Sequence, residues 1–167
     1  MRVNLKTPIT YWGGKQTLLH EILPLIPEHT TYCEPFFGGG AVFFGKKPSK
    51  VEIINDLNRV VINFFEQSES NFEALRGRIR ATPHSRAHYM DALVMYNNPH
   101  LFTKLDLAWA FYTLCNQGYS GKIGTWGFAT ATNGCCSSCF SAFENSSRFC
   151  SRISCARASR RSGFVMK

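Results

Sequence analysis

The chain lacks any apolar run long enough to cross a membrane. No stretch of about 18 consecutive apolar residues occurs in its 167 residues. Residues 1–6 are not followed by the apolar core of a signal peptide. Cysteine is scarce over most of the chain, because only two of the seven lie in residues 1–134, as in an ordinary reduced intracellular protein. We therefore expect a cytoplasmic protein that has no membrane partner.

Acidic residues are also few, with 11 Asp and Glu against 19 Lys and Arg, which gives a formal charge of +8. Such a balance indicates an anionic partner, of which nucleic acid is the commonest. The chain is 44% hydrophobic and 14% aromatic, so it is globular rather than disordered. Its length suits one domain with a real core.

The last segment, residues 135–167, differs in composition from the rest. It holds nine serines, five cysteines and five arginines, without helical or strand periodicity. Four of the cysteines could supply a thiolate zinc site, namely Cys136, Cys139, Cys150 and Cys155. A disulfide framework would conflict with a cytoplasmic protein. The interpretation we favour is an out-of-frame translation that begins after about residue 133, where the composition changes abruptly.

A glycine-rich loop follows the first predicted strand, residues 31–34. The loop contains three consecutive glycines, Gly38 to Gly40, and an apolar helix start follows at residues 41–44. Glycine lets a backbone adopt positive φ and approach a ligand closely. In open α/β sheets, a loop at the carboxyl end of a strand binds nucleotide-like cofactors. The alternative is a flexible turn without a ligand.

An acidic residue ends the second predicted strand, residues 51–55. Asp56 lies 18 positions after Gly38. A carboxylate about 20 residues beyond the glycine turn typically holds a ribose through its hydroxyls. Asp56 could instead be the N-cap of a helix predicted over residues 57–65.

The N-terminal segment also contains a candidate binding residue. Residues 7–15 predict an extended segment that ends in a tight Gly13-Gly14 turn, and a helix follows over residues 15–23 until Pro24 ends it. Lys15 is poorly placed for the dipole at that helix start, which favours a role in binding a carboxylate or phosphate. The alternative is a solvated lysine.

The rest of the chain is predicted to be helical. We expect helices over residues 72–80, 85–96 and 104–116, and a glycine-punctuated loop or hairpin over residues 112–127. The first two helices and their connection carry a basic stretch that suits either DNA backbone contacts or an ordinary solvated face: Arg76, Arg78, Arg80, His84, Arg86 and His88.

Three motifs together resemble the D12 class of site-specific DNA adenine methyltransferases, the DNA adenine methylase type of bacteria and their phages. They are Thr-Tyr-Trp-Gly-Gly-Lys at 10–15, Glu-Pro-Phe-Phe-Gly-Gly-Gly-Ala-Val-Phe at 34–43 and Ile-Asn-Asp-Leu-Asn at 54–58. The resemblance implies an α/β fold, a partial Rossmann-like class I methyltransferase domain. Residues 1–66 would form the N-terminal part of this S-adenosylmethionine-binding domain, and residues 67–133 a helical insert for target recognition.

The resemblance also implies S-adenosyl-L-methionine as cofactor and double-stranded DNA as partner, for a chain that we expect to be a monomer. Lys15 would lie near the methionine carboxylate, the loop from Glu34 to Gly40 under the methionine part, and Asp56 at the ribose. The implied cofactor-binding residues are Tyr11, Trp12, Gly14, Lys15, Glu34, Pro35, Phe36, Gly38, Gly40 and Asp56. The turn at Tyr119, Ser120 and Lys122 resembles the DNA-contacting Tyr-Asn-Gly loop, although Cys115-Asn116 replaces the family's usual Asn-Arg pair.

The family's catalytic Asp-Pro-Pro-Tyr motif is absent, because the chain contains no Pro-Pro dipeptide. In the family, the Asp side chain and a carbonyl accept the adenine amino hydrogens, and the aromatic ring stacks on the flipped base. We therefore expect a methyltransferase by descent that is truncated before its catalytic motif and has little or no activity. The alternative is a non-catalytic DNA-binding remnant. A dinucleotide-dependent oxidoreductase is disfavoured because no G-x-G-x-x-G follows the first strand.

Overall fold

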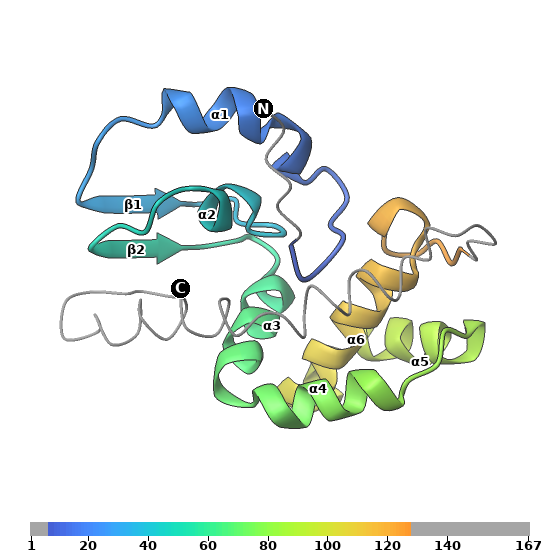
Figure 1. Ribbon diagram of the computed structural model, residues 1–167. Helices are drawn as coiled ribbons and strands as arrows, with labels where there is room; N and C mark the ends of the chain where they lie inside the picture. The colour runs from blue at the N-terminus through green and yellow to red at the C-terminus, as the bar shows by residue number, and fades with distance from the viewer. Residues whose placement is uncertain (1–6, 128–167) are drawn as a thin grey trace.

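The computed structural model describes residues 7–127, which form a small parallel sheet packed against a group of helices (Figure 1). Strands β1 (Thr31–Glu34) and β2 (Val51–Ile54) pair in parallel, with Thr31 opposite Val51 and Glu34 opposite Ile54. The predicted first strand is confirmed at both ends, and the second ends one residue earlier than predicted. Both carboxyl ends face the same edge, so residues that follow them come close together.

A short helical layer covers the sheet. It consists of the 3₁₀ helix η1 (Lys15–Leu18), α1 (Leu19–Leu25) and α2 (Ala41–Gly45). Helices α1 and α2 pack through the buried side chains of Leu19, Ala41 and Val42. The prediction that Pro24 ends the first helix was wrong, because the helix continues through it to Leu25. Ile26 is extended instead, since it precedes Pro27 and a residue before proline avoids the helical region.

The remaining elements are helical, and three of them begin at side-chain caps. They are α3 (Arg59–Ser70), α4 (Phe72–Ala81), α5 (Arg86–Asn97), η2 (Pro99–Leu101), α6 (Lys104–Gln117) and η3 (Tyr119–Gly121). Asn58 caps α3, Ser85 caps α5, and Thr103 forms a capping box with Asp106 at α6. The helices predicted over 72–80, 85–96 and 104–116 are confirmed to within one residue at each end. Among the described helices, none is long and apolar enough to cross a membrane.

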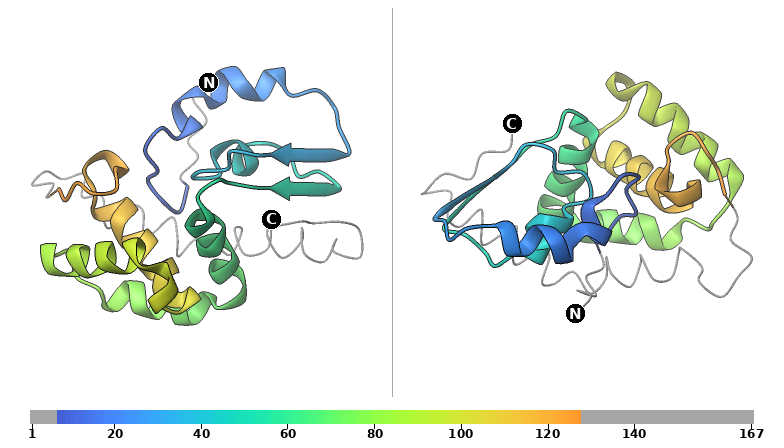
Figure 2. Two further views of the ribbon diagram at one scale, coloured as in Figure 1. Left: turned by 180° about the vertical axis from the view of Figure 1, so that it is seen from behind. Right: turned by 90° about the horizontal axis from the view of Figure 1, so that it is seen from above.

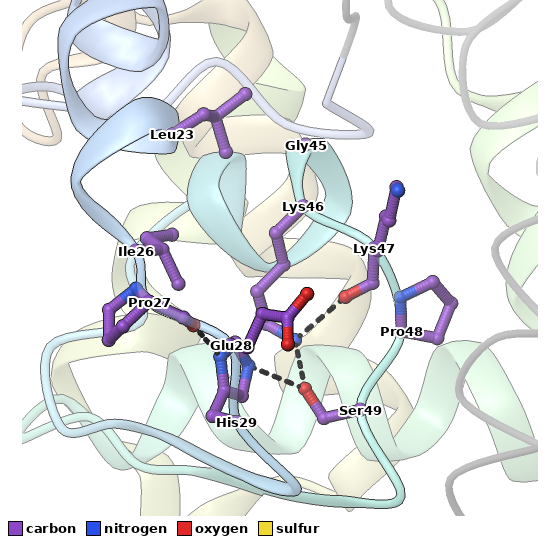
Figure 3. A pocket seen from close by; sticks show the side chains of 10 residues that line it. All are labelled: Leu23, Ile26, Pro27, Glu28, His29, Gly45, Lys46, Lys47, Pro48 and Ser49. Atoms are coloured by element: carbon purple, nitrogen blue, oxygen red, sulfur yellow. Dashed lines mark hydrogen bonds between the residues drawn. The ribbon is translucent and has the colours of Figure 1, made fainter.

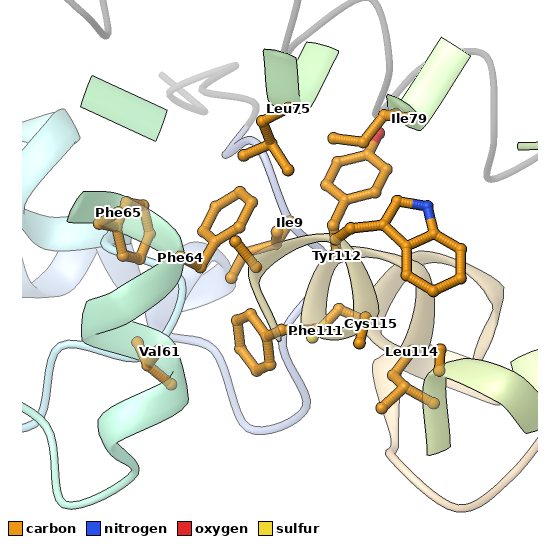
Figure 4. Packing of buried hydrophobic residues seen from close by; sticks show 14 of the residues in the cluster. Ile9, Val61, Phe64, Phe65, Leu75, Ile79, Phe111, Tyr112, Leu114 and Cys115 are labelled. Atoms are coloured by element: carbon orange, nitrogen blue, oxygen red, sulfur yellow. The ribbon is translucent and has the colours of Figure 1, made fainter. Parts of the chain in front are cut away.

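Helix α6 is the centre of the core, and every residue from Ala108 to Gln117 is buried. A helix that is apolar all round belongs inside a protein. It packs against α3 and α5, and Figure 4 shows Phe64 of α3 beside Phe111 of α6, with ring centroids 5.9 Å apart. Residues 112–117 therefore belong to this helix, and the prediction of a loop there was wrong, because the glycine-punctuated turn begins only at Gly118.

One hydrophobic core joins the sheet to the helices. It includes Ile9, Phe37 and Ile54 from the α/β part and Leu75 and Leu114 from the helical part. Figure 2 shows how α3 connects the two parts. The predicted boundary between residues 66 and 67 falls within α3, and that division stays a prediction. The tail from residue 135 on, with its proposed zinc and frameshift interpretations, lies outside the described residues.

Candidate functional site

The glycine loop and Asp56 meet at the carboxyl ends of the two strands. The backbone N–H of Gly38 donates to Asp56 Oδ2 at 2.7 Å, and that of Asn58 donates to Oδ1 at 2.9 Å. The alternative that Asp56 caps the following helix is wrong, since Asn58 Oδ1 accepts from Val60 N–H at 3.1 Å and takes that role. Asp56 instead ties the end of β2 to the loop after β1.

Aromatic side chains pack closely around the glycine loop. Gly40 has φ +73°, and a Cβ there would lie 2.6 Å from Phe44 Cε2 and 2.8 Å from Phe37 Cζ. Only glycine fits such a conformation at such a distance. The buried Gly40 therefore lies behind the loop, whereas Gly38 lies beside the ring of Tyr11, whose Cδ1 would be 3.2 Å from an added Cβ.

Lys15 reaches across to the start of the loop. Its Nζ lies 3.0 Å from Oε1 of Glu34 and donates to the carbonyl of Phe36 at 2.5 Å. The side chain of Glu34 is only 6% exposed, and Tyr32 Oη donates to its Oε2 at 3.2 Å. Burial raises the pKa of Glu34, and Lys15 opposes that rise. Lys15 therefore has a carboxylate partner within the chain, and its predicted binding of a ligand's carboxylate or phosphate stays a prediction.

The aromatic residues of the first motif differ in exposure. The half-buried Tyr11 packs 6.1 Å from Phe111, and burial, followed by the nearby Asp56 carboxylate, raises the pKa of its hydroxyl. Its carbonyl accepts from Gly14 N–H at 3.0 Å, which closes the predicted turn. Trp12 on that turn is 64% exposed, and Phe36 is 73% exposed. The structure therefore brings together Tyr11, Lys15, Glu34, Gly38 and Asp56, and leaves Trp12, Pro35 and Phe36 on the outside.

The predicted DNA-contacting residues lie on a compact turn after α6. Tyr119, Ser120 and Lys122 are all exposed. Tyr119 N–H donates to the carbonyl of Thr125 at 2.8 Å, and an antiparallel bridge joins Gly118 to Trp126. Ser120 has φ +52°, a left-handed conformation that asparagine tolerates better than serine. That preference gives a physical reason for asparagine in the Tyr-Asn-Gly motif that this turn resembles.

The basic stretch on α4 and α5 is largely engaged within the protein. Arg78 forms an ion pair with Asp106 and lies 4.6 Å above the ring of Trp109. Arg76 pairs with Glu73 at 3.4 Å, and His88 Nδ1 lies 2.6 Å from Ser85 Oγ. These contacts favour a structural role for Arg78 and His88 over a DNA-binding one.

A cavity of about 550 Å³ lies at the opposite, amino-terminal end of the strands (Figure 3). Buried Lys46 Nζ contacts Glu52 Oε1 at 2.5 Å and Ser49 Oγ at 2.8 Å. Ser49 Oγ is also 2.8 Å from His29 Nε2, while His29 Nδ1 faces the carbonyl of Pro27 at 2.7 Å. These polar groups are hydrogen-bonded to one another, and they connect the loop before β1 to the loop before β2. They lie at the other end of the strands from the glycine-loop site.

Sequence reasoning missed three residues that shape the site. Tyr32 could have been found, because it precedes Glu34 by two positions on a strand and so shares its face. Asn58 carried the signal of an Asx cap two positions after Asp56. Asn116, whose Oδ1 accepts from Thr10 N–H at 3.1 Å, had no local signal, since 106 positions separate the two residues.

Comparison with known proteins agrees with the motifs. A sequence model described as the D12 class N6 adenine-specific DNA methyltransferase matches residues 11–133. The type II methyltransferase M1.LlaDCHI of Lactococcus lactis subsp. cremoris is 40% identical over 94 residues, which are 54% of this chain and 32% of that protein. The modification methylase StsI of Streptococcus sanguinis is 40% identical over 62 residues, which are 36% of this chain and 9% of that protein.

A third relative is the DNA N-6-adenine-methyltransferase of Escherichia phage P1, 36% identical over 63 residues, which are 38% of this chain and 8% of that protein. The chain thus spans about a third or less of the length of these relatives. Because the family's sequence model covers most of the chain, the resemblance is confirmed, and the chain belongs to the D12 class of N6 adenine-specific DNA methyltransferases.

Proposed function

We propose that residues 7–58 form the S-adenosyl-L-methionine site of a site-specific DNA adenine N6-methyltransferase. The observation that carries the proposal is the hydrogen bond from Gly38 N–H to Asp56, which fixes a carboxylate beside the glycine loop at the carboxyl ends of β1 and β2. Ligands bind at this edge in open α/β sheets. When bound, the cofactor supplies the methyl group that is transferred.

The residues present fit this cofactor. Each oxygen of Asp56 accepts one backbone hydrogen bond, and a carboxylate oxygen has two lone pairs, so acceptors are left for two ribose hydroxyls. Glu34 Oε1 is buried and, apart from its ion pair with Lys15, accepts no hydrogen bond from residues 7–127. It can therefore accept from the amino group of the methionine part. Lys15 has one donor left for the methionine carboxylate, since an ammonium carries three and two of them face Glu34 and the Phe36 carbonyl.

Isothermal titration of the 167-residue chain with S-adenosyl-L-methionine tests this site. We expect saturable binding, weakened at least about tenfold by Asp56→Asn, because a charge-assisted hydrogen bond contributes about 1.5–3 kcal/mol. Asp91→Asn is the matched control, since Asp91 is an exposed carboxylate on α5. Equal weakening by both variants, or an absence of binding to the wild-type chain, would contradict the proposed cofactor site.

We further propose that this 167-residue chain does not transfer the methyl group by itself. No Asp-Pro-Pro-Tyr motif occurs in it, so it lacks the acceptors that the family uses to free the adenine lone pair. The test is transfer of labelled methyl groups from S-adenosyl-L-methionine to double-stranded DNA. N6-methyladenine formed by the purified chain would refute the proposal.

A second candidate function is DNA binding without catalysis, and the exposed turn at Tyr119, Ser120 and Lys122 favours it. We propose a monomer that contacts double-stranded DNA through this turn, in the cytoplasm where such DNA is found. A mobility shift across a salt series tests the contact, since phosphate contacts make affinity fall steeply with salt. Light scattering of the purified chain tests the monomer.

A further inference from the structure

The turn that carries Trp12 and the turn that carries Lys122 are held together in space. The backbone N–H of Thr10 donates to the buried Asn116 at the end of α6. Gly121 lies so close to Thr10 that an added Cβ would be 2.4 Å from its carbonyl oxygen. Two independent contacts therefore fix the predicted cofactor-side turn against the predicted DNA-side turn.

With the two turns held together in this way, Lys122 Nζ lies 5.7 Å from the centroid of the Trp12 ring. That separation is within the range of about 6 Å for a cation–π contact, and tryptophan is the aromatic residue best suited to it. Within residues 7–127, Lys122 has no carboxylate partner. Among residues 7–127, the indole ring is therefore the group placed to position this ammonium.

Such a contact suits a lysine that binds an anion. A carboxylate would hold the ammonium but neutralise its charge, whereas an indole ring holds it and leaves the charge available. A lysine side chain has many rotamers, and ordering it before the partner arrives reduces the entropy cost of binding. Both residues are exposed, so a DNA phosphate can reach the ammonium.

We propose that Trp12 is a positioning residue for DNA binding, and that its ring holds the ammonium of Lys122 ready for a DNA phosphate. This inference rests on the proposed function, because DNA is the partner. It gives Trp12 a role on the DNA side in addition to its predicted place beside the cofactor. The cofactor-side and DNA-side turns then share one contact.

A double-mutant cycle on the full 167-residue chain tests the inference, with DNA affinity measured from about 50 to 200 mM salt. Lys122→Gln should make the slope of log affinity against log salt shallower by about 0.9, as expected for one lost phosphate contact. Trp12→Leu should weaken binding about two- to fivefold. When Lys122→Gln is already present, adding Trp12→Leu should cause no further loss of DNA affinity. Trp12→Phe, which keeps a ring, should recover most of the affinity.

Two outcomes would overturn the positioning role while leaving the proposed function intact: an unchanged affinity in Trp12→Leu, or losses that multiply in the double variant. The second would mean that Trp12 acts independently of Lys122. An absence of DNA binding by the wild-type chain would contradict the proposed DNA contact itself, and the positioning role with it.

A DNA-free measurement checks the contact directly. Lysines labelled with ¹³C-dimethyl groups keep their charge, and Lys122→Arg identifies the Lys122 signal by its loss. In the wild-type chain, the ring current of Trp12 should shift this signal, and Trp12→Leu should return it to the position of an exposed lysine. A signal that does not move in Trp12→Leu would overturn the proposal.

Discussion

The Asp56 carboxylate accepts the backbone N–H of Gly38 at 2.7 Å and so links the ends of two neighbouring parallel strands. The same carboxylate accepts from Asn58 N–H, at the start of α3. One side chain thus fixes the glycine loop, the end of β2 and the entry to the next helix. If Asp56 binds a ligand as proposed, its carboxylate is positioned before the ligand arrives.

Replacement of Asp56 by alanine should therefore destabilise the free protein as well as its ligand complex. Asp56→Ala leaves two backbone N–H groups without their acceptor, and each unsatisfied group costs about 1–3 kcal/mol when it is shielded from water. We expect a loss of about 2 kcal/mol in the free energy of unfolding, measured by urea denaturation without ligand. Asp91→Ala on the exposed face of α5 is the control and should change stability by less than about 0.5 kcal/mol.

Replacement of Gly121 by alanine should lower the free energy of unfolding more than replacement of Gly13, although the two glycines have nearly the same φ angle. Their φ angles are +73° and +74°, so alanine meets similar conformational strain of about 1–2 kcal/mol at each. At Gly13 an added Cβ meets nothing within 4 Å, whereas at Gly121 it would collide with the Thr10 carbonyl.

We expect Gly121→Ala to cost at least about 2 kcal/mol more than Gly13→Ala in the free energy of unfolding, because a packed backbone cannot move aside cheaply. The measurement is the midpoint of urea denaturation for both variants. Equal losses would mean that the two turns are not packed together as described.

Much of the site could be predicted from local sequence, because its main elements follow one another within a single strand–loop–strand segment. The strand over residues 31–34 and the carboxylate at Asp56 were predicted from apolar runs, glycines and spacing alone. The role of Asp56 as a cap was an equally local possibility, and it failed because Asn58 is nearer to the helix start. When two nearby residues have similar capping chemistry, the sequence does not show which of them caps the helix, because that depends on the residue at which the backbone becomes helical.

Contacts between distant segments could not be predicted in the same way. The pairing of Thr10 with Asn116, and of Trp12 with Lys122, depends on how α6 packs through the core. The burial of α6 also made its last turn ambiguous, since the aromatic and polar residues from Tyr112 to Gln117 show no amphipathic pattern, and residues 112–116 were predicted both as helix and as part of a loop. The structural roles of Arg78 and Lys46 likewise depend on partners in other segments.

In the buried ion pair of Lys46 and Glu52, replacing one partner should strongly lower the stability of the fold, whereas replacing both by apolar residues should lower it much less. Their side chains are 4% and 3% exposed, and the atoms in contact are 2.5 Å apart. Lys46→Met leaves a buried carboxylate without its cation, which costs about 3–5 kcal/mol. The double variant Lys46→Met/Glu52→Leu removes both charges and should recover most of that loss. Thermal unfolding of the three proteins tests this, and a double variant that is less stable than Lys46→Met would contradict it.

Glu34 should make stability depend on pH in a direction that its burial determines. Burial raises its pKa above the usual value in spite of the ion pair with Lys15. An acid with a higher pKa in the folded chain than in the unfolded chain binds its proton more tightly when folded. Its favourable contribution to stability is therefore fully present below the unfolded pKa and is lost as pH rises through the folded pKa.

Glu34→Gln is uncharged at every pH and keeps an oxygen that accepts from Lys15. The stability of the wild-type chain relative to this variant should thus be greatest near about pH 4 and should fall as pH rises toward about 7. Urea denaturation of both proteins at several pH values in this window measures the difference, with Glu28→Gln as the exposed control. A difference that grows with pH would show that the ion pair with Lys15 outweighs the burial of the carboxylate, and a difference that stays constant would show that the two effects balance. Either result would contradict the prediction.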